Sequence, residues 1–150
     1  MKLIKRVGVS DARKHMADLF TDAVYKNKLT VFSRYEKERA FLVGEKLMDL
    51  LVCPEVPANN KEVIEEEDGS YTVHYLPLDL LTNQDNYEEA IEDLVCQAKD
   101  YASDFLDNVE LYLSDESRKK HLPFMVAIAK ATSDDEIKSL MGLLEEQWVE

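Results

Sequence analysis

The side chains that could support catalysis or hold a metal ion are scattered along this chain of 150 residues. His15, His74 and His121 do not form a spacing such as His-Glu-x-x-His, and the chain contains no Gly-rich phosphate loop and no Gly-x-Ser-x-Gly motif. Catalysis would have to rest on carboxylates alone. We therefore expect a protein that is not an enzyme and that needs no cofactor or metal; a carboxylate-dependent metal enzyme is the weakest alternative.

Two short charged runs allow both a binding and a structural interpretation. The acidic run at residues 65–68 has the oxygen ligands that a hard cation prefers, but successive strand residues point to opposite faces and do not converge. A solvated hairpin end is the favoured interpretation. The basic run at residues 118–121 suits an anion-binding patch as well as it suits the carbonyl end of a helix.

The two cysteines and the N-terminus bound the environment of the protein. Cys53 and Cys96 have no partner at a short spacing, so we expect buried, reduced thiols and neither a disulfide framework nor a thiolate metal site. The N-terminal residues lack the apolar run of a signal peptide, and no stretch is long and apolar enough to span a membrane. We expect a cytoplasmic protein with no membrane partner.

Basic residues are concentrated at the start of the chain. Residues 1–52 contain eleven Lys or Arg and seven Asp or Glu, a net charge of +4, whereas residues 53–150 contain seven and twenty-four, a net charge of −17. A basic head suits phosphates and an acidic body suits a basic protein. The alternative is an acidic domain whose head is basic by chance.

The element pattern predicts an α+β protein with two units. Two prolines and two asparagines within residues 53–60 predict a linker between a unit at residues 1–52 and a unit at residues 61–150. In the first unit, a strand at 3–9 leads to a helix capped by Ser10 and ending near Tyr25, whose apolar residues recur at steps of three and four. Strands at 29–33 and 40–43 and a helix at 45–51 complete a β-α-β-β-α order.

The second unit is predicted to be a β-hairpin followed by about three helices. Asp68 and Gly69 separate strands at 61–67 and 70–76 and favour a type I′ turn. A loop follows Pro77. One long helix is expected from Tyr87 to Tyr112, a second helix begins at Pro123, and a third runs to Leu144. Capping boxes start the first and third of these helices, formed by Asn86 with Glu89 and by Ser133 with Glu136.

Four residues of the basic unit are suited to nucleic acid. Arg13 and Lys14 stand in the first turns of the predicted helix that Ser10 caps, and Arg34 ends a strand at the predicted hairpin. Arginine, lysine and the start of a helix are common phosphate contacts in DNA-binding proteins. Each residue alone is more often a surface charge, and their placement in one small unit is what favours binding.

The segments VSDARKHM (residues 9–16), LTVFSR (29–34) and AFLV (40–43) resemble, in order and spacing, the N-terminal domain of the Phd/YefM antitoxins. The resemblance covers about the first third of the chain. It implies a dimer or higher oligomer whose N-terminal domains bind operator DNA and repress their own operon. It also implies that the C-terminal part neutralises a cognate toxin, possible types of which include a ribonuclease. The acidic charge of this part suggests that the toxin is a basic protein.

The resemblance also implies roles for individual residues. Arg13 falls on the arginine that enters the operator groove, and Arg34 falls on the second DNA-contacting arginine. Ser10 falls on the capping residue near a phosphate, with Lys14 beside this group, and His15 replaces the usual asparagine. We expect these five residues to bind DNA.

The chain departs from typical members after the first unit. They end in a tail that is disordered until toxin binds, whereas residues 61–150 here have the periodicity of a folded domain, as in a longer Phd-like form. Residues 1–52 are therefore the expected dimerisation and DNA-binding domain, and residues 61–150 the expected toxin-binding domain. The alternative function is a non-catalytic adaptor, or a stand-alone transcriptional regulator with the same fold.

Overall fold

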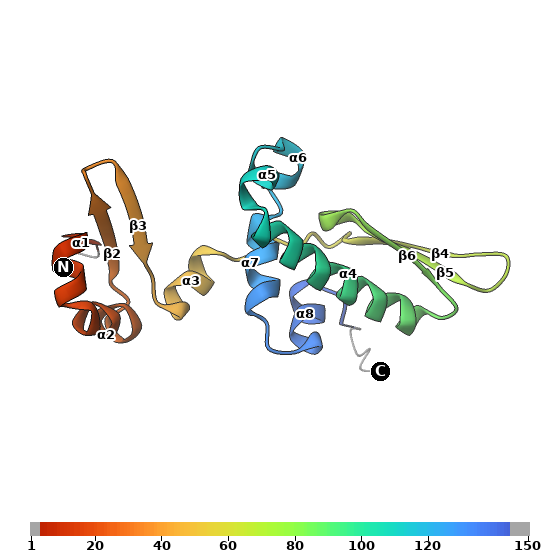
Figure 1. Ribbon diagram of the computed structural model, residues 1–150. Helices are drawn as coiled ribbons and strands as arrows, with labels where there is room; N and C mark the ends of the chain where they lie inside the picture. The colour runs from red at the N-terminus through yellow and green to blue at the C-terminus, as the bar shows by residue number, and fades with distance from the viewer. Residues whose placement is uncertain (1–3, 145–150) are drawn as a thin grey trace. The chain divides into compact units, whose positions relative to one another are not determined.

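The computed structural model describes residues 4–144, and the chain divides after Val52 into two compact units. We call them the N-terminal unit and the C-terminal unit, and Figure 1 shows the elements of each. Both units combine strands with helices, so the predicted α+β fold class is confirmed. None of the described helices is long and apolar enough to cross a membrane.

The N-terminal unit is a three-stranded sheet with helices on one face. The strands stand in the order β1-β2-β3, with β1 parallel to β2 and β3 antiparallel to it. A parallel pair needs a crossover connection, which two helices supply here. The elements are β1 (Ile4–Gly8), α1 (Val9–Lys14), α2 (Met16–Lys26), β2 (Leu29–Arg34), β3 (Glu38–Leu42) and α3 (Glu45–Leu51).

The helix predicted between Ser10 and Tyr25 is two helices. Gly8 is the N-cap of α1 and Ser10 lies inside its first turn, so the prediction that Ser10 caps the helix is wrong. His15 separates α1 from α2, since its backbone (φ −120°, ψ 23°) leaves the helical region. The apolar spacing continues unchanged across His15, and for this reason periodicity alone does not reveal the break.

The core of the N-terminal unit is small. Ala12 of α1 and Leu19 and Ala23 of α2 are at most 3% exposed, and Thr30 of β2 is buried with them. The link between β3 and α3 passes very close to α2 at Gly44. A Cβ built on this glycine would lie 2.3 Å from the carbonyl oxygen of Ala23, so the approach requires a residue without a side chain.

The C-terminal unit is an antiparallel sheet, β4-β5-β6, with α4 on one face. In turn, α7 and α8 pack on α4. Val73, Tyr75, Leu94 and Phe105 are among the most buried side chains of the resulting core. The elements are β4 (Lys61–Glu65), β5 (Tyr71–Tyr75), the 3-10 turn η1 (Leu76–Leu78), β6 (Leu80–Gln84), α4 (Tyr87–Asp107), α5 (Val109–Leu113), α6 (Glu116–Lys119), α7 (Leu122–Lys130) and α8 (Asp134–Leu140).

Several local predictions for this unit are confirmed. The Asn86 side chain accepts a hydrogen bond from the backbone N–H of Glu89 (2.9 Å), and Ser133 caps α8 in the same way. The hairpin around Asp68 and Gly69 is also present. Its turn is not type I′, because only Gly69 has a positive φ (83°) there.

Other predictions for this unit are wrong. The long helix ends at Asp107 and not at Tyr112, because the backbone of Asn108 (φ −127°, ψ 41°) leaves the helical region. The Asn108 side-chain amide donates to the Asp104 carbonyl at this helix end. The segment after Pro77, predicted as a loop, contains the third strand β6. Cys53 and Cys96, expected to be buried, are both exposed free thiols.

Residues 53–60 are predicted as a linker. The last part of this segment belongs to the C-terminal unit. Val56 packs against the core of that unit, and Asn60 is buried. The Asn60 amide donates to the carbonyl oxygens of Met141 and Gly142, at 3.1 and 3.0 Å. The Asn60 carbonyl accepts a hydrogen bond from the N–H of Leu76. These bonds fix the start of β4 against the end of α8.

Candidate nucleic-acid interface

The five residues predicted to bind DNA all lie in the N-terminal unit. Ser10, Arg13 and Lys14 belong to α1, His15 follows α1, and Arg34 is the last residue of β2. All five are exposed. Each side chain is therefore accessible to a partner from solvent.

The parallel pairing of β1 and β2 places these residues at one end of the sheet. Gly8, the last residue of β1, lies opposite Ser33 of β2. The residue after Gly8 begins α1, and the residue after Ser33 is Arg34. Since α1 also packs against both strands, the segment that carries Arg13 and the side chain of Arg34 start from the same sheet end.

Arg34 is held by its own hairpin. Its Nε donates to Glu38 Oε2 at 2.5 Å, and its guanidinium carbon lies 5.7 Å from the centre of the Tyr35 ring. Tyr35 and Glu36 both have positive φ (52° and 58°), so the chain turns tightly at this hairpin without a glycine. The ion pair is solvated, and the guanidinium has five N–H donors, so several remain available to phosphate or a base edge.

The start of α1 is not itself an anion site. The helix has only six residues, Ser10 makes no capping bond, and Asp11 places a negative charge in the first turn. A phosphate contact here depends on the cationic side chains of Arg13 and Lys14. Both lie in the last turn of α1, where cations also interact favourably with the carbonyl end of a helix.

Two further arginines, which are not among the five predicted site residues, lie on the sheet face opposite the helices. Arg6 on β1 and Arg39 on β3 line an open hollow of about 490 Å³ together with Val31, Ser33, Glu36 and Phe41. The signal available in the sequence was the alternation along β3, which places Arg39 and Phe41 on one face. Thr30, on the other face of β2, is buried.

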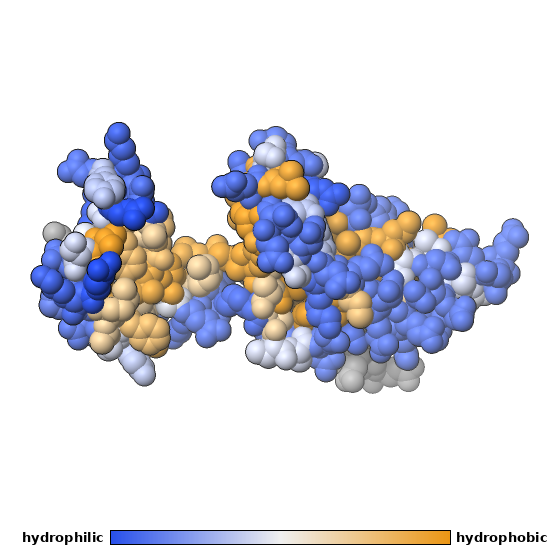
Figure 2. All heavy atoms as spheres, viewed as in Figure 1, coloured by the Kyte–Doolittle hydropathy of each residue, from blue (hydrophilic) through white to orange (hydrophobic). Residues whose placement is uncertain are grey.

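The N-terminal unit leaves apolar side chains uncovered. Met16, Phe20 and Val24 follow one another at four-residue steps along α2 and are 47%, 59% and 41% exposed. Phe41 on the open sheet face is 62% exposed. Figure 2 shows apolar residues at the surface of this unit beside hydrophilic ones. Such clustered exposure is typical of a surface that another chain covers.

The acidic run at residues 65–68 is engaged within its own hairpin. Asp68 accepts hydrogen bonds from the N–H and the hydroxyl of Ser70, and these bonds lower the pKa of its carboxyl. Glu66 accepts a hydrogen bond from the Thr72 hydroxyl at 2.7 Å. Within residues 4–144, no group of three or more His, Cys, Asp or Glu side chains is placed to hold a metal ion.

The basic run at residues 118–121 surrounds an aromatic cluster of the C-terminal unit. The Arg118 guanidinium lies over the rings of Tyr101 and Tyr112, at 5.6 and 5.8 Å from their centres. His121 is 7% exposed, and its Nδ1 is hydrogen-bonded to the Tyr101 hydroxyl at 2.8 Å. Burial, together with Lys120 and Arg118, lowers the pKa of His121, so the neutral imidazole is favoured.

A network of side-chain hydrogen bonds joins α4 to β6. The Thr82 hydroxyl donates to Asp93 at 2.6 Å, and the Gln97 amide donates to Asp93 and to the Leu81 carbonyl. The hydrogen bonds from Thr82 and Gln97 lower the pKa of the Asp93 carboxyl. The Asp93 carboxylate therefore has a structural role, because it holds α4 against β6.

Comparison with known proteins shows the family of almost the whole chain. A family model described as "Antitoxin of toxin-antitoxin, RelE / RelB, TA system" matches residues 1–143. Among solved structures, the chain is similar to the 1.80 Å crystal structure of an antitoxin part of a proposed toxin/antitoxin system from Syntrophomonas wolfei subsp. wolfei. The TM-score is 0.76 at 19% identity, over 91% of this chain and 95% of that chain, which shows a shared fold. No curated protein matches the chain.

Proposed function

The chain belongs to the PHD-like family of antitoxins of RelE/RelB-type toxin–antitoxin systems, and on that premise we propose that it neutralises its toxin and represses its own operon. Operator binding is assigned to the N-terminal unit and toxin binding to the C-terminal unit. Both activities are placed in the cytoplasm, where operator DNA and the toxin are found together.

The observation that carries the DNA-binding proposal is the register of β1 with β2. It brings α1 and Arg34 to one end of a sheet, as a groove-binding unit needs. In the proposed complex Arg13 contacts base edges and Arg34 makes the second arginine contact. Lys14 supplies the charge that holds a phosphate, and the Ser10 hydroxyl, which makes no capping bond, donates to the phosphate backbone as a neutral partner. His15 stands where the family has asparagine, and its ring nitrogens can donate to a phosphate.

A homodimer is part of this proposal. Operators that are palindromic are read by two-fold symmetric proteins, which present the same arginines to each half-site. The exposed apolar side chains of the N-terminal unit supply surface for such pairing: Met16, Phe20 and Val24 on α2, and Phe41 on β3.

The charge of the C-terminal unit supports toxin binding. Residues 53–150 carry a net charge of −17, which attracts a basic partner such as a ribonuclease-type toxin and steers its encounter. The same charge repels DNA. It would therefore suppress non-specific binding and leave the N-terminal unit to select the operator.

The proposal is tested by replacing both arginines, Arg13→Ala with Arg34→Ala, and measuring operator binding by fluorescence anisotropy. Loss of two base or phosphate contacts per half-site predicts an affinity at least about a hundredfold lower and a shallower dependence on salt. The matched control is Lys28→Ala with Lys46→Ala, which removes the same charge from exposed or partly exposed positions away from this sheet end. Operator affinity in the double arginine variant equal to that of the control would refute the assignment.

A further inference from the structure

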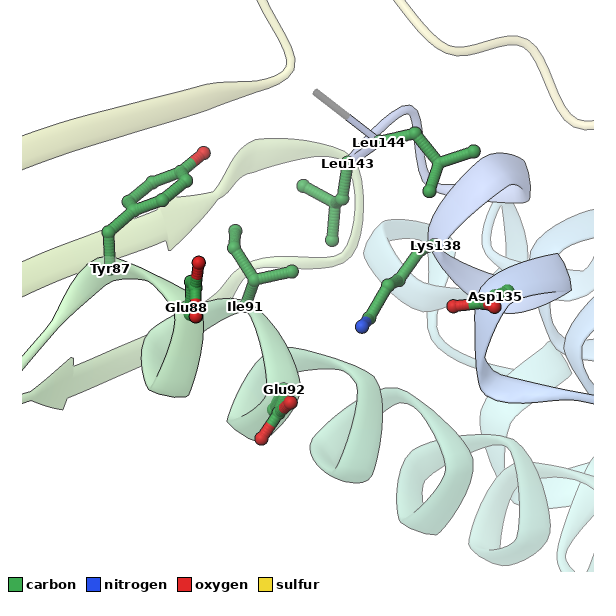
Figure 3. A pocket seen from close by; sticks show the side chains of 8 residues that line it. All are labelled: Tyr87, Glu88, Ile91, Glu92, Asp135, Lys138, Leu143 and Leu144. Carbon is green, nitrogen blue, oxygen red and sulfur yellow. The ribbon is translucent and has the colours of Figure 1, made fainter. Parts of the chain in front are cut away.

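The C-terminal unit has a groove between α4 and α8 whose lining combines apolar and acidic side chains. We call it the α4–α8 groove. Its volume is about 280 Å³, which accommodates one or two protein side chains and is smaller than most sites for small ligands. Figure 3 shows its lining residues, which are Tyr87, Glu88, Ile91 and Glu92 of α4, Asp135 and Lys138 of α8, and Leu143 and Leu144 beyond it.

The floor of the groove is apolar. Ile91 and Leu143 are 6% and 3% exposed, and Figure 3 shows their side chains turned toward one another. Leu144 is 52% exposed, which makes it one of the few large apolar side chains at the surface of this unit. A partner side chain that enters the groove would bury Leu144 and the ring of Tyr87.

The charges around the floor have no partners within the part of the chain that the structure describes. Glu88, Glu92 and Asp135 form no ion pair and accept no side-chain hydrogen bond there. Among the described residues of the lining Lys138 is the one cation, and its side chain extends toward α4 in Figure 3. The described lining of the groove therefore has three carboxylates and one cation, an excess of negative charge.

Two other hollows of this unit do not have this combination. In the hollow between α4 and α7, the carboxylate of Asp134 is already paired with Lys99 at 2.9 Å. The hollow beside η1 is lined by Arg118 and Lys120 as well as by Asp79 and Asp100, so its charges balance. Charge complementarity to a basic protein therefore favours the α4–α8 groove.

We propose that the α4–α8 groove is the anchor site for the toxin, and that it receives an arginine or lysine side chain with an adjacent apolar residue. The inference rests on the proposed function. The aliphatic stem of the cation would lie on Ile91 and Leu143, and its charge would reach Glu88 and Glu92 on the rim. Burial of Leu144 by the adjacent apolar residue would fix the position of the segment.

The chain's own C-terminal residues are a less suitable occupant. Residues 145–150 contain three glutamates and no lysine or arginine, so their charge has the same sign as the rim of the groove. A second copy of this unit is disfavoured for the same reason, because it carries the same acidic charge.

The test compares two variants that remove the same charge from different places. Glu88→Gln with Glu92→Gln alters the groove, and Glu65→Gln with Glu67→Gln alters the hairpin of β4 and β5, where both glutamates are exposed. The probe is the purified protein encoded by the gene next to this one, and its affinity is measured by biolayer interferometry at 150 mM salt. The groove variant should bind it about tenfold more weakly, and the hairpin variant within about twofold of the wild type.

For a third variant we expect the opposite effect, an increase in affinity for the toxin. Lys138→Gln removes the one repelling charge from the groove and should strengthen binding about threefold, whereas Lys119→Gln, an exposed lysine of α6, should change it less. A role of Lys138 in folding alone would not produce tighter binding. Circular dichroism and thermal melts on all four variants verify that they are folded.

Each outcome distinguishes this inference from the proposed function. If the wild type binds the neighbouring gene's product and the groove and hairpin variants lose affinity equally, the groove is not the anchor, although toxin binding stands. The same conclusion follows if the groove variant changes self-association in size-exclusion chromatography and leaves toxin binding unchanged. It also follows if the groove variant weakens toxin binding only when residues 145–150 are present. If the wild type does not bind at all, the proposed function itself fails.

Discussion

At the end of β2, the guanidinium of Arg34 already has an anionic partner. Glu38 pairs with it across the hairpin, and both side chains are more than half exposed, at 58% and 57%. An ion pair this solvated contributes little to stability, typically less than about 1 kcal/mol. In the proposed complex with DNA, its main effect is electrostatic, because the Glu38 carboxylate would compete with phosphate for the same donors.

We therefore expect Glu38→Gln to strengthen operator binding by roughly threefold with almost no change in thermal stability. The control is Glu45→Gln, which removes the same charge from the first turn of α3. Fluorescence anisotropy against operator DNA measures both. If the two variants bind alike, or Glu38→Gln binds more weakly, Glu38 orients Arg34 and does not compete with DNA.

His121 makes the stability of the C-terminal unit depend on pH. Burial and the neighbouring cations lower its pKa in the folded protein, so the unfolded chain binds a proton more readily. Its contribution is fully present above a pH of about 6.5 and is lost as the pH falls from there through the lowered pKa. We expect the melting temperature to decline between pH 7.5 and pH 5.5.

Calorimetric melts of His121→Gln should show a flatter dependence over this range, and His15→Gln, an exposed residue of the other unit, should follow the wild type. The window lies above the pH at which Asp93, whose pKa is lowered, loses its own contribution. If the melting temperature of the His121→Gln variant depends on pH with the same slope as that of the wild type, His121 is not the cause of the decline.

At the scale of elements, the N-terminal unit depends on a close approach between α2 and the turn into α3. Gly44 is buried there, and the carbonyl oxygen of Ala23 occupies the position that a Cβ would take. Backbone cannot move aside as a flexible side chain can. The position of α3 relative to α2 is therefore fixed by one residue.

Gly44→Ala should destabilise the protein by about 1–3 kcal/mol, the usual cost of overfilling a packed site. Gly8→Ala is the matched control, since a Cβ there meets nothing within 4 Å. Its effect should be well below 1 kcal/mol. Chemical denaturation measures both, and equal free energies of unfolding for the two variants would contradict the packing argument.

Local signals in the sequence predicted these elements well where a short motif determines the structure. The caps at Asn86 and Ser133 are confirmed because each depends on residues three apart. The resemblance to Phd/YefM antitoxins is also confirmed, by the family match over residues 1–143.

The incorrect predictions have a common physical cause. At these positions tertiary contacts or single side chains determine the secondary structure. The strand β6 forms because β5 pairs with it, and its own sequence, LLTNQ, has little strand character. The break at His15 and the end of α4 at Asn108 leave the apolar spacing intact. At the candidate site, Arg6 and Arg39 went unnoticed because only the sheet pairing brings them to one face.

At the scale of the whole molecule, the separation of charge follows the separation into units. The boundary after Val52 divides a net charge of +4 from a net charge of −17. Each unit has its own sheet and its own buried core. If the proposed assignment of the two activities to the two units is right, DNA binding and toxin neutralisation can be lost independently.

The most direct measurement of that independence uses the Arg13→Ala, Arg34→Ala variant in cells that express the neighbouring toxin gene and carry an operator-driven reporter. We expect the variant to protect growth as well as the wild type does, while repression of the reporter is lost. A variant that still represses the reporter at the wild-type level, or that fails to protect growth although it is folded, would contradict the division of function between the two units.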